Sequence, residues 1–130
     1  DVAGAGGTSW SQVEKFRSTI PVKRKAADAF SEWGIPTVDC ITSVRDHIEN
    51  QPVIASGGVK TGVDAAKAIA LGSDLVGVGR AILKEATQSI EDVMEVMETR
   101  ELELRMAMFG IGATNLKELQ DTDRLRVESR

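Results

Sequence analysis

The sequence contains one cysteine, no tyrosine, three phenylalanines and two tryptophans among its 130 residues. The lone Cys40 can form no internal disulfide, and so few cysteines are typical of a reducing, cytoplasmic compartment. With so few aromatic residues, the core must be built from Ala, Val, Ile, Leu and Met. No apolar run approaches the roughly 20 residues of a membrane-spanning helix, and no signal peptide is recognisable. We therefore expect neither a membrane protein nor a secreted one.

Charge and motif patterns exclude further classes. The net charge is −4, with acidic and basic residues interspersed, so the chain lacks the basic surface that nucleic acids require. A G-x-G-x-x-G fingerprint beginning at Gly4 fails because position 9 is Ser9, and no G-x-x-x-x-G-K-[ST] loop is present. His47, the only histidine, has no partner at metal-ligand spacing, so we expect a surface residue. Cys40 lacks an activating neighbour and is not expected to be a nucleophile.

The most informative stretch is residues 52–83, PVIASGGVKTGVDAAKAIALGSDLVGVGRAIL. Its first apolar run has the pattern of a parallel strand covered on both faces. Thr61 and Asp64 predict a capping box at the start of a helix, and Gly72 predicts a left-handed end to it. The predicted order is strand 52–55, helix 62–71, strand 75–78 and a further helical piece at 81–83.

Two strand–glycine–helix units in tandem place both glycine turns at the carboxyl end of one parallel sheet. This is the place where barrels of eight strands and eight helices bind phosphate, because free N–H groups and a helix N-terminus attract the dianion. Arg80 and Lys60 add positive charge there. We predict a phosphate clamp made of Ser56, Gly57, Gly58, Val59, Lys60, Gly79 and Arg80. The alternative is that these glycines only form tight turns.

The remaining elements are predicted to be helical. In the second of them Ala26, Ala29, Phe30 and Trp33 share one face, so Trp33 is expected in the core or at a subunit interface. In the fourth, residues 98–100 interrupt the apolar pattern and predict a phase change or a kink. Gly110 and Gly112 are expected to end that helix, and residues 120–130 to form a frayed tail. The predicted helices are 11–17, 22–33, 38–49, 89–109 and 113–119.

Several segments carry a family resemblance. The segments IASGGV, DAAKAIALGSD and GVGR, between Ile54 and Arg80, resemble the FMN-binding barrels, which include relatives of IMP dehydrogenase, glycolate oxidase and glutamate synthase. The segments GAGGTSW (residues 4–10) and WGIPT (residues 33–37) are similar to those of the type 2 isopentenyl-diphosphate isomerases. The resemblance extends through most of the chain and weakens after about Leu119.

The resemblance implies an α/β fold, roughly the C-terminal half of a (β/α)8 TIM barrel. A whole barrel needs about 200 residues or more, so we expect residues 1–130 to form a single partial domain of a longer enzyme. The implied reaction converts isopentenyl diphosphate to dimethylallyl diphosphate, with reduced FMN, Mg²⁺ and NADPH as reductant. The implied flavin contact is Thr8, whose alternative role is to cap the following helix.

No acid–base constellation is recognisable in the chain, so we expect no catalytic residue and no magnesium ligand here. The implied catalytic and Mg²⁺-binding residues lie in the part of the barrel that is missing, and the chain alone is expected to be inactive. Exposed barrel edges favour self-association, so a homo-oligomer is expected. Two alternatives remain open: part of another FMN oxidoreductase, of the IMP dehydrogenase or 2-hydroxy-acid oxidase kind, or a noncatalytic half-barrel that binds phosphate or itself.

Overall fold

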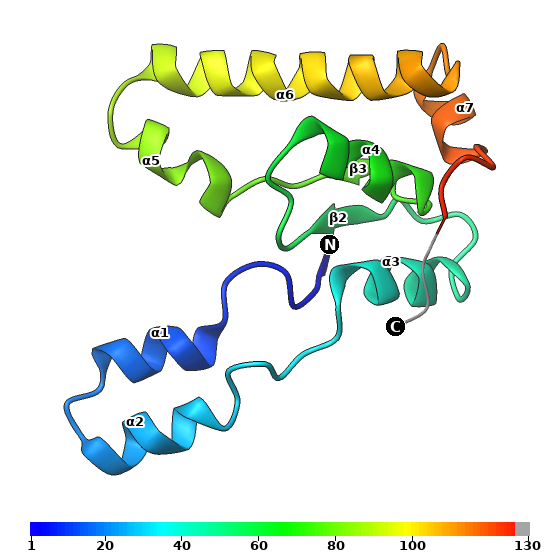
Figure 1. Ribbon diagram of the computed structural model, residues 1–130. Helices are drawn as coiled ribbons and strands as arrows, with labels where there is room; N and C mark the ends of the chain where they lie inside the picture. Colours follow the sequence, from blue (N-terminus) through cyan, green and yellow to red (C-terminus); the bar gives the residue numbers. More distant parts are fainter. Residues whose placement is uncertain (127–130) are drawn as a thin grey trace.

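A computed structural model describes residues 1–126 and has an α/β architecture built on a small parallel sheet (Figure 1). The sheet has three strands in the order β1-β2-β3. The strands are short: β1 is Val2–Ala3, β2 is Ile54–Ser56 and β3 is Leu75–Val76. Both predicted strands are therefore confirmed, although the first begins two residues later and the second ends two residues earlier than expected. The parallel arrangement also confirms that the turns after β2 and β3 leave the same edge of the sheet.

Helices connect the strands and follow the last of them. They are α1 (Trp10–Arg17), α2 (Pro21–Asp28), α3 (Thr37–Arg45), α4 (Gly62–Ala70), a 3₁₀ turn η1 (Arg80–Ile82), α5 (Leu83–Ala86), α6 (Ile90–Ile111) and α7 (Leu116–Gln120). Local sequence signals place several of their ends correctly. Thr61 and Asp64 form the predicted capping box of α4, while Gly72 and Gly112 have positive φ after α4 and α6.

Helices within residues 1–126 cover one face of the sheet only. The covered face carries three side chains that lie side by side in register: Val2, Ala55 and Val76. They pack with Ile41 of α3 and Ala68 of α4 in one buried cluster. Ile54 and Leu75 point to the opposite face and remain 37% and 58% exposed. The prediction that the first strand is covered on both faces is therefore wrong for the described chain, because no element packs on this second face.

A second cluster joins α4, α6 and α7 through Ala66, Ile69 and Leu119, and α6 forms the outer layer in Figure 1. The interruption of the apolar pattern near residues 98–100 does not break α6, which continues for 22 residues. Gly110 lies inside this helix and does not end it. The helix continues because its inward face still packs on α4 at this point, through Ala107, Met108 and Ile111.

The α1–α2 hairpin stands apart from the sheet (Figure 1). Its second helix ends at Asp28, so the predicted helix over residues 22–33 is five residues too long. Beyond Asp28 the backbone tightens into turns, with hydrogen bonds from Phe30 to Ala27 and from Trp33 to Phe30. Trp33 consequently leaves the helix and is 79% exposed, which contradicts the prediction of a core position.

At the amino end of the strands, Asp74 holds several elements together. One carboxylate oxygen accepts hydrogen bonds from the Val53 N–H and from the Arg45 guanidinium, both at 2.7 Å. These bonds lower the pKa of Asp74, with the Val53 N–H as the largest cause and the Arg45 bond next. Helix α3 ends at Arg45, four residues before the predicted end, where this side chain turns to Asp74 and to the Gly72 carbonyl.

The C-terminal segment is partly as predicted. The short helix α7 begins after Asn115, whose side chain accepts a hydrogen bond from the Glu118 N–H. This helix starts three residues later than the expected 113–119 segment. Of the tail 120–130, residues 127–130 lie outside the described chain, so fraying there stays a prediction.

Candidate functional site

The turn after β2 is shaped by two glycines in positive φ, Gly57 at 89° and Gly58 at 90°. Both also lie against the loop that follows β1. A Cβ on Gly57 would lie 2.6 Å from the Gly4 carbonyl oxygen, and one on Gly58 would lie 2.4 Å from that of Gly6. Glycine is therefore required here by backbone conformation and by close loop packing. This contact accounts for the two glycines after β2 without any ligand. It also holds their turn against the β1 loop, which contains Thr8.

The backbone donors of the predicted clamp fall into two groups. Within residues 1–126, the N–H groups of Gly58, Val59, Gly79 and Arg80 donate no hydrogen bond. Lys60 differs, because its N–H donates to an Asp64 carboxylate oxygen at 3.1 Å. The clamp therefore retains free donors on both turns, while the Lys60 backbone is already engaged.

Asp64 and Ser56 also have partners. Burial raises the pKa of Asp64, but hydrogen bonds from Lys60 and Thr61 outweigh this effect and hold it below the ordinary value. Asp64 is therefore ionised at neutral pH and serves the start of α4. The Ser56 hydroxyl donates to an Asp1 carboxylate oxygen at 2.8 Å, so it is not free to donate to an anion in this structure.

The turn after β3 is more open. The Gly77 N–H donates to the Ala55 carbonyl at 2.7 Å and keeps this segment beside β2. No atom would lie within 4 Å of a Cβ on Gly79, so the space next to this residue is empty. Arg80 begins η1 and is exposed, as is Lys60 after the other turn. Two positive charges and free N–H donors thus flank one edge of the sheet, which suits an anion.

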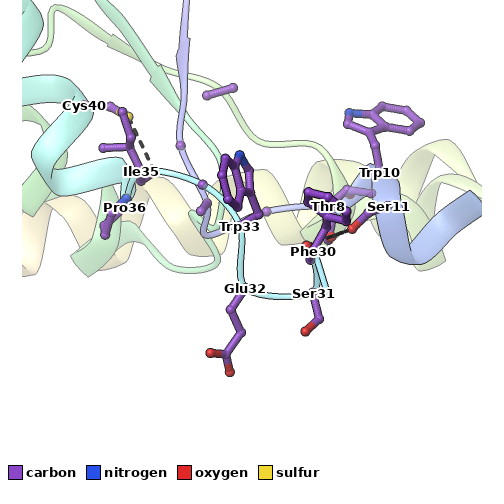
Figure 2. Close-up of a pocket in the computed structure, with 16 residues that line it drawn as sticks. Thr8, Trp10, Ser11, Phe30, Ser31, Glu32, Trp33, Ile35, Pro36 and Cys40 are labelled. Carbon is purple, nitrogen blue, oxygen red and sulfur yellow. Dashed lines mark hydrogen bonds between the residues drawn. The ribbon is translucent and has the colours of Figure 1, made fainter. Parts of the chain in front are cut away.

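An open cleft of about 1050 Å³ lies between the loop after β1 and the segment before α3 (Figure 2). It includes Thr8, the predicted flavin contact, but no residue of the predicted clamp. Ser9, not Thr8, occupies the N-cap position of α1, so Thr8 is not that helix's cap. Glu32 is the only charged residue among those lining the cleft, and Figure 2 shows its side chain directed away from Trp33.

Sequence patterns alone did not predict which residues form the walls of this cleft. Phe30 and Trp33 form an edge-to-face pair with ring centroids 5.6 Å apart. Two hydrogen bonds hold their segment against α1 and the β1 loop. The Ser11 hydroxyl of α1 donates to the Phe30 carbonyl at 2.9 Å, and the Ala5 N–H of the loop donates to the Ile35 carbonyl at 2.7 Å. The WGIPT segment was visible in the sequence, but nothing local indicated that its tryptophan lies beside Thr8.

Neither the cysteine nor the histidine belongs to the clamp, although Cys40 is among the residues that line the cleft (Figure 2). Cys40 is half-buried in α3, where its thiol contacts the Ile35 carbonyl at 3.5 Å. His47 is exposed just beyond the end of α3, and its Nδ1 lies 2.7 Å from the Ser43 carbonyl oxygen. Because α3 leads into the start of β2, His47 lies toward the amino edge of the sheet. Residues 1–126 contain no cluster of three metal-ligating side chains, and no helix among them is long and apolar enough to cross a membrane.

Comparison with known proteins shows which proteins this chain resembles. The isopentenyl-diphosphate delta-isomerase of Oceanobacillus iheyensis is 60% identical over 127 residues, which are 98% of this chain and 36% of that protein. The isomerases of Vibrio campbellii and Stutzerimonas stutzeri are 50% and 45% identical over 96% and 99% of the chain. The chain spans 37% of each of these two proteins, so it covers about a third of the length of these relatives.

The family comparison covers most of the chain. Residues 31–126 match the FMN-dependent dehydrogenase family, and this match includes both glycine turns and the whole of β2 and β3. The chain therefore belongs to the FMN-dependent dehydrogenase family.

Proposed function

We propose that this chain is the flavin-phosphate-binding part of an enzyme that converts isopentenyl diphosphate to dimethylallyl diphosphate. The observation that carries the proposal is the 60% identity to an isopentenyl-diphosphate delta-isomerase along 98% of the chain. The matched 127 residues cover nearly the whole chain, and the geometry brings the loop after β1 and both glycine turns to one edge of the sheet. The substrate and the reaction are those of the longer protein.

The free donors on the two turns fit the phosphate of FMN. Gly58 and Val59 offer N–H groups after β2, and Gly79 and Arg80 offer them after β3. The Arg80 guanidinium would neutralise the dianion, and the Lys60 ammonium would add a second charge. Thr8 would lie toward the flavin ring, in a cleft whose lining carries little charge. When bound, reduced FMN supplies the acid–base group for this reaction. The alkene of the substrate is unactivated, and ordinary side chains are too weak as acids to protonate it.

We also propose that the sheet forms part of a (β/α)8 barrel. Parallel sheets are covered on both faces, yet Ile54 and Leu75 remain exposed on the face without helices. In a barrel this face would turn inward and pack against the remaining strands. The Mg²⁺ ligands and the residues that contact the diphosphate would then come from the rest of the longer enzyme. Reduction of FMN by NADPH would also depend on that part.

The alternative of an FMN oxidoreductase has less support. A catalytic histidine or cysteine would have to lie at the carboxyl edge of the sheet, where active sites of this fold are built. His47 lies toward the amino edge. Cys40 lines the cleft with Thr8, but its thiol contacts the Ile35 carbonyl in the segment before α3. The third possibility, a noncatalytic self-associating unit, predicts oligomerisation without flavin binding.

A chimera tests the proposal directly. The matching 127 residues of the Oceanobacillus iheyensis isomerase would be replaced by this chain, and conversion of isopentenyl diphosphate would be followed with FMN, Mg²⁺ and NADPH. We expect activity within about tenfold of the parent enzyme, since 60% of the matched residues are identical. An Arg80→Ala chimera should lose FMN during gel filtration more readily. A folded chimera that retains FMN but converts no substrate would contradict the proposed reaction.

A further inference from the structure

Thr37 makes a hydrogen bond that its position in the sequence does not predict. It is the first residue of α3, yet neither it nor the N-cap residue Pro36 makes a side-chain cap for that helix. Its hydroxyl instead donates to the carbonyl oxygen of Gly57 at 2.7 Å, across 20 residues of sequence. This bond joins the WGIPT segment to the glycine turn after β2.

The surroundings of Thr37 leave it little room to move. A Cβ on Gly4 would lie 2.3 Å from the Thr37 Cα, so the β1 loop presses on the start of α3. On the other side, a Cβ on Gly57 would lie 3.2 Å from the Thr37 hydroxyl oxygen. Thr37 is therefore held between the two loops, and its hydroxyl has a fixed position from which to bind the Gly57 carbonyl.

This bond sets the direction of one backbone donor. The peptide that links Gly57 to Gly58 is trans, as are all peptides of the described residues 1–126. In a planar trans peptide the C=O and the N–H point in opposite directions. Because Thr37 holds the Gly57 carbonyl, the Gly58 N–H must point away from Thr37. That N–H is one of the free donors on this edge of the sheet.

A peptide between two glycines rotates more easily than any other, since neither residue has a Cβ to restrict it. Rotation by half a turn would present the Gly57 carbonyl, with its partial negative charge, where the Gly58 N–H now points. A phosphate would then meet an acceptor in place of a donor, and the interaction would become repulsive. The direction of this single peptide therefore decides whether the turn attracts or repels an anion.

We propose that Thr37 is a positioning residue for anion binding: its hydroxyl locks the Gly57–Gly58 peptide with the N–H directed toward the flavin phosphate. The inference rests on the proposed function, because it takes the phosphate of FMN as the anion. Thr37 itself does not touch the phosphate. It acts through the backbone of the turn, so the loss of its hydroxyl weakens binding of the phosphate group and not of the flavin ring.

The test compares FMN with riboflavin, which lacks the phosphate. Both ligands are titrated by flavin fluorescence quenching into the unmodified chain, Thr37→Val and Thr37→Ser. We expect Thr37→Val to weaken FMN binding about tenfold, the loss of one charge-assisted hydrogen bond, and to leave riboflavin binding unchanged. Thr37→Ser retains the hydroxyl and should restore FMN affinity. The matched control is Thr42→Val, on the same helix, whose hydroxyl bonds only to carbonyls of α3.

Each outcome decides the matter. Equal FMN affinity of Thr37→Val and the unmodified chain would overturn this inference and leave the proposed function standing. Parallel weakening of FMN and riboflavin, together with a lower melting temperature, would show that Thr37 is only structural. An unmodified chain that binds FMN no more tightly than riboflavin would overturn the phosphate clamp and this inference with it.

Discussion

Substitution of Gly58 by alanine tests whether the turn after β2 depends on glycine. The new Cβ would lie 2.4 Å from the Gly6 carbonyl oxygen, and the backbone would have to keep a φ of 90°. A left-handed conformation costs an alanine about 1–2 kcal/mol. Forcing the two loops apart adds about 1–3 kcal/mol, the usual cost of overpacking. We therefore expect Gly58→Ala to lower the free energy of unfolding by about 3 kcal/mol.

Urea unfolding followed by circular dichroism at 222 nm measures this difference. The matched control is Gly110→Ala, because Gly110 lies inside α6 and no atom would lie within 4 Å of its new Cβ. An alanine there should raise stability by about 0.5–1 kcal/mol, since glycine is a poor helix residue. The reasoning would be refuted by a Gly58→Ala variant whose stability lies within about 0.5 kcal/mol of the unmodified chain.

Three further predictions concern the two edges of the sheet and the α4–α6 contact. Asp74→Asn should lower stability by about 1 kcal/mol at neutral pH. The folded pKa of Asp74 lies below its ordinary 3.8, so its contribution to stability disappears as the pH falls through that lower value. In urea unfolding, the free energy of unfolding of the variant should therefore decrease less on acidification than that of the unmodified chain. Gly62→Ala places a Cβ 2.1 Å from the Arg100 carbonyl oxygen and should cost about 2 kcal/mol in thermal melts. Arg80→Ala should weaken FMN binding about tenfold in fluorescence titrations, whereas the exposed Lys84→Ala should not.

Local signals in the sequence predicted those parts of the fold that local chemistry determines. Thr61 and Asp64 form a reciprocal cap within four residues of chain, so the start of α4 could be recognised without knowledge of any distant contact. Gly72 ends the same helix for an equally local reason, its positive φ of 108°. Such signals involve only neighbouring residues, so contacts with distant parts of the chain do not change them.

The end of α2 shows where local reasoning fails. The spacing of Ala26, Phe30 and Trp33 continues a helical pattern, yet the helix stops at Asp28. The Ser11 hydroxyl donates a hydrogen bond to the Phe30 carbonyl. The Gly34 backbone lies so close to Ala5 that a Cβ on Gly34 would be 2.7 Å from the Ala5 Cβ. Both contacts come from segments distant in sequence, so the periodicity could not reveal that Trp33 would face a cleft.

The candidate site, like the fold, has parts that the sequence predicts and parts that it does not. The two glycine turns could be recognised because each follows an apolar strand, and parallel strands end at a common edge. The engagement of the Lys60 N–H by Asp64 could have been inferred from the capping box, which places that carboxylate beside the start of α4. The bond from Thr37 to the Gly57 carbonyl could not be inferred, because it joins two motifs that only the fold brings together.

Backbone groups at the two edges of the sheet differ in their hydrogen bonding. At the amino edge, Asp74 satisfies the Val53 N–H, and the Gln120 amide bonds the neighbouring Ser73 carbonyl. At the carboxyl edge, Gly58 and Arg80 keep N–H groups that donate to nothing within residues 1–126. A donor without a protein partner costs about 1–3 kcal/mol unless water or a ligand accepts from it. Under the proposed function, the phosphate of the flavin would be the acceptor for these N–H groups.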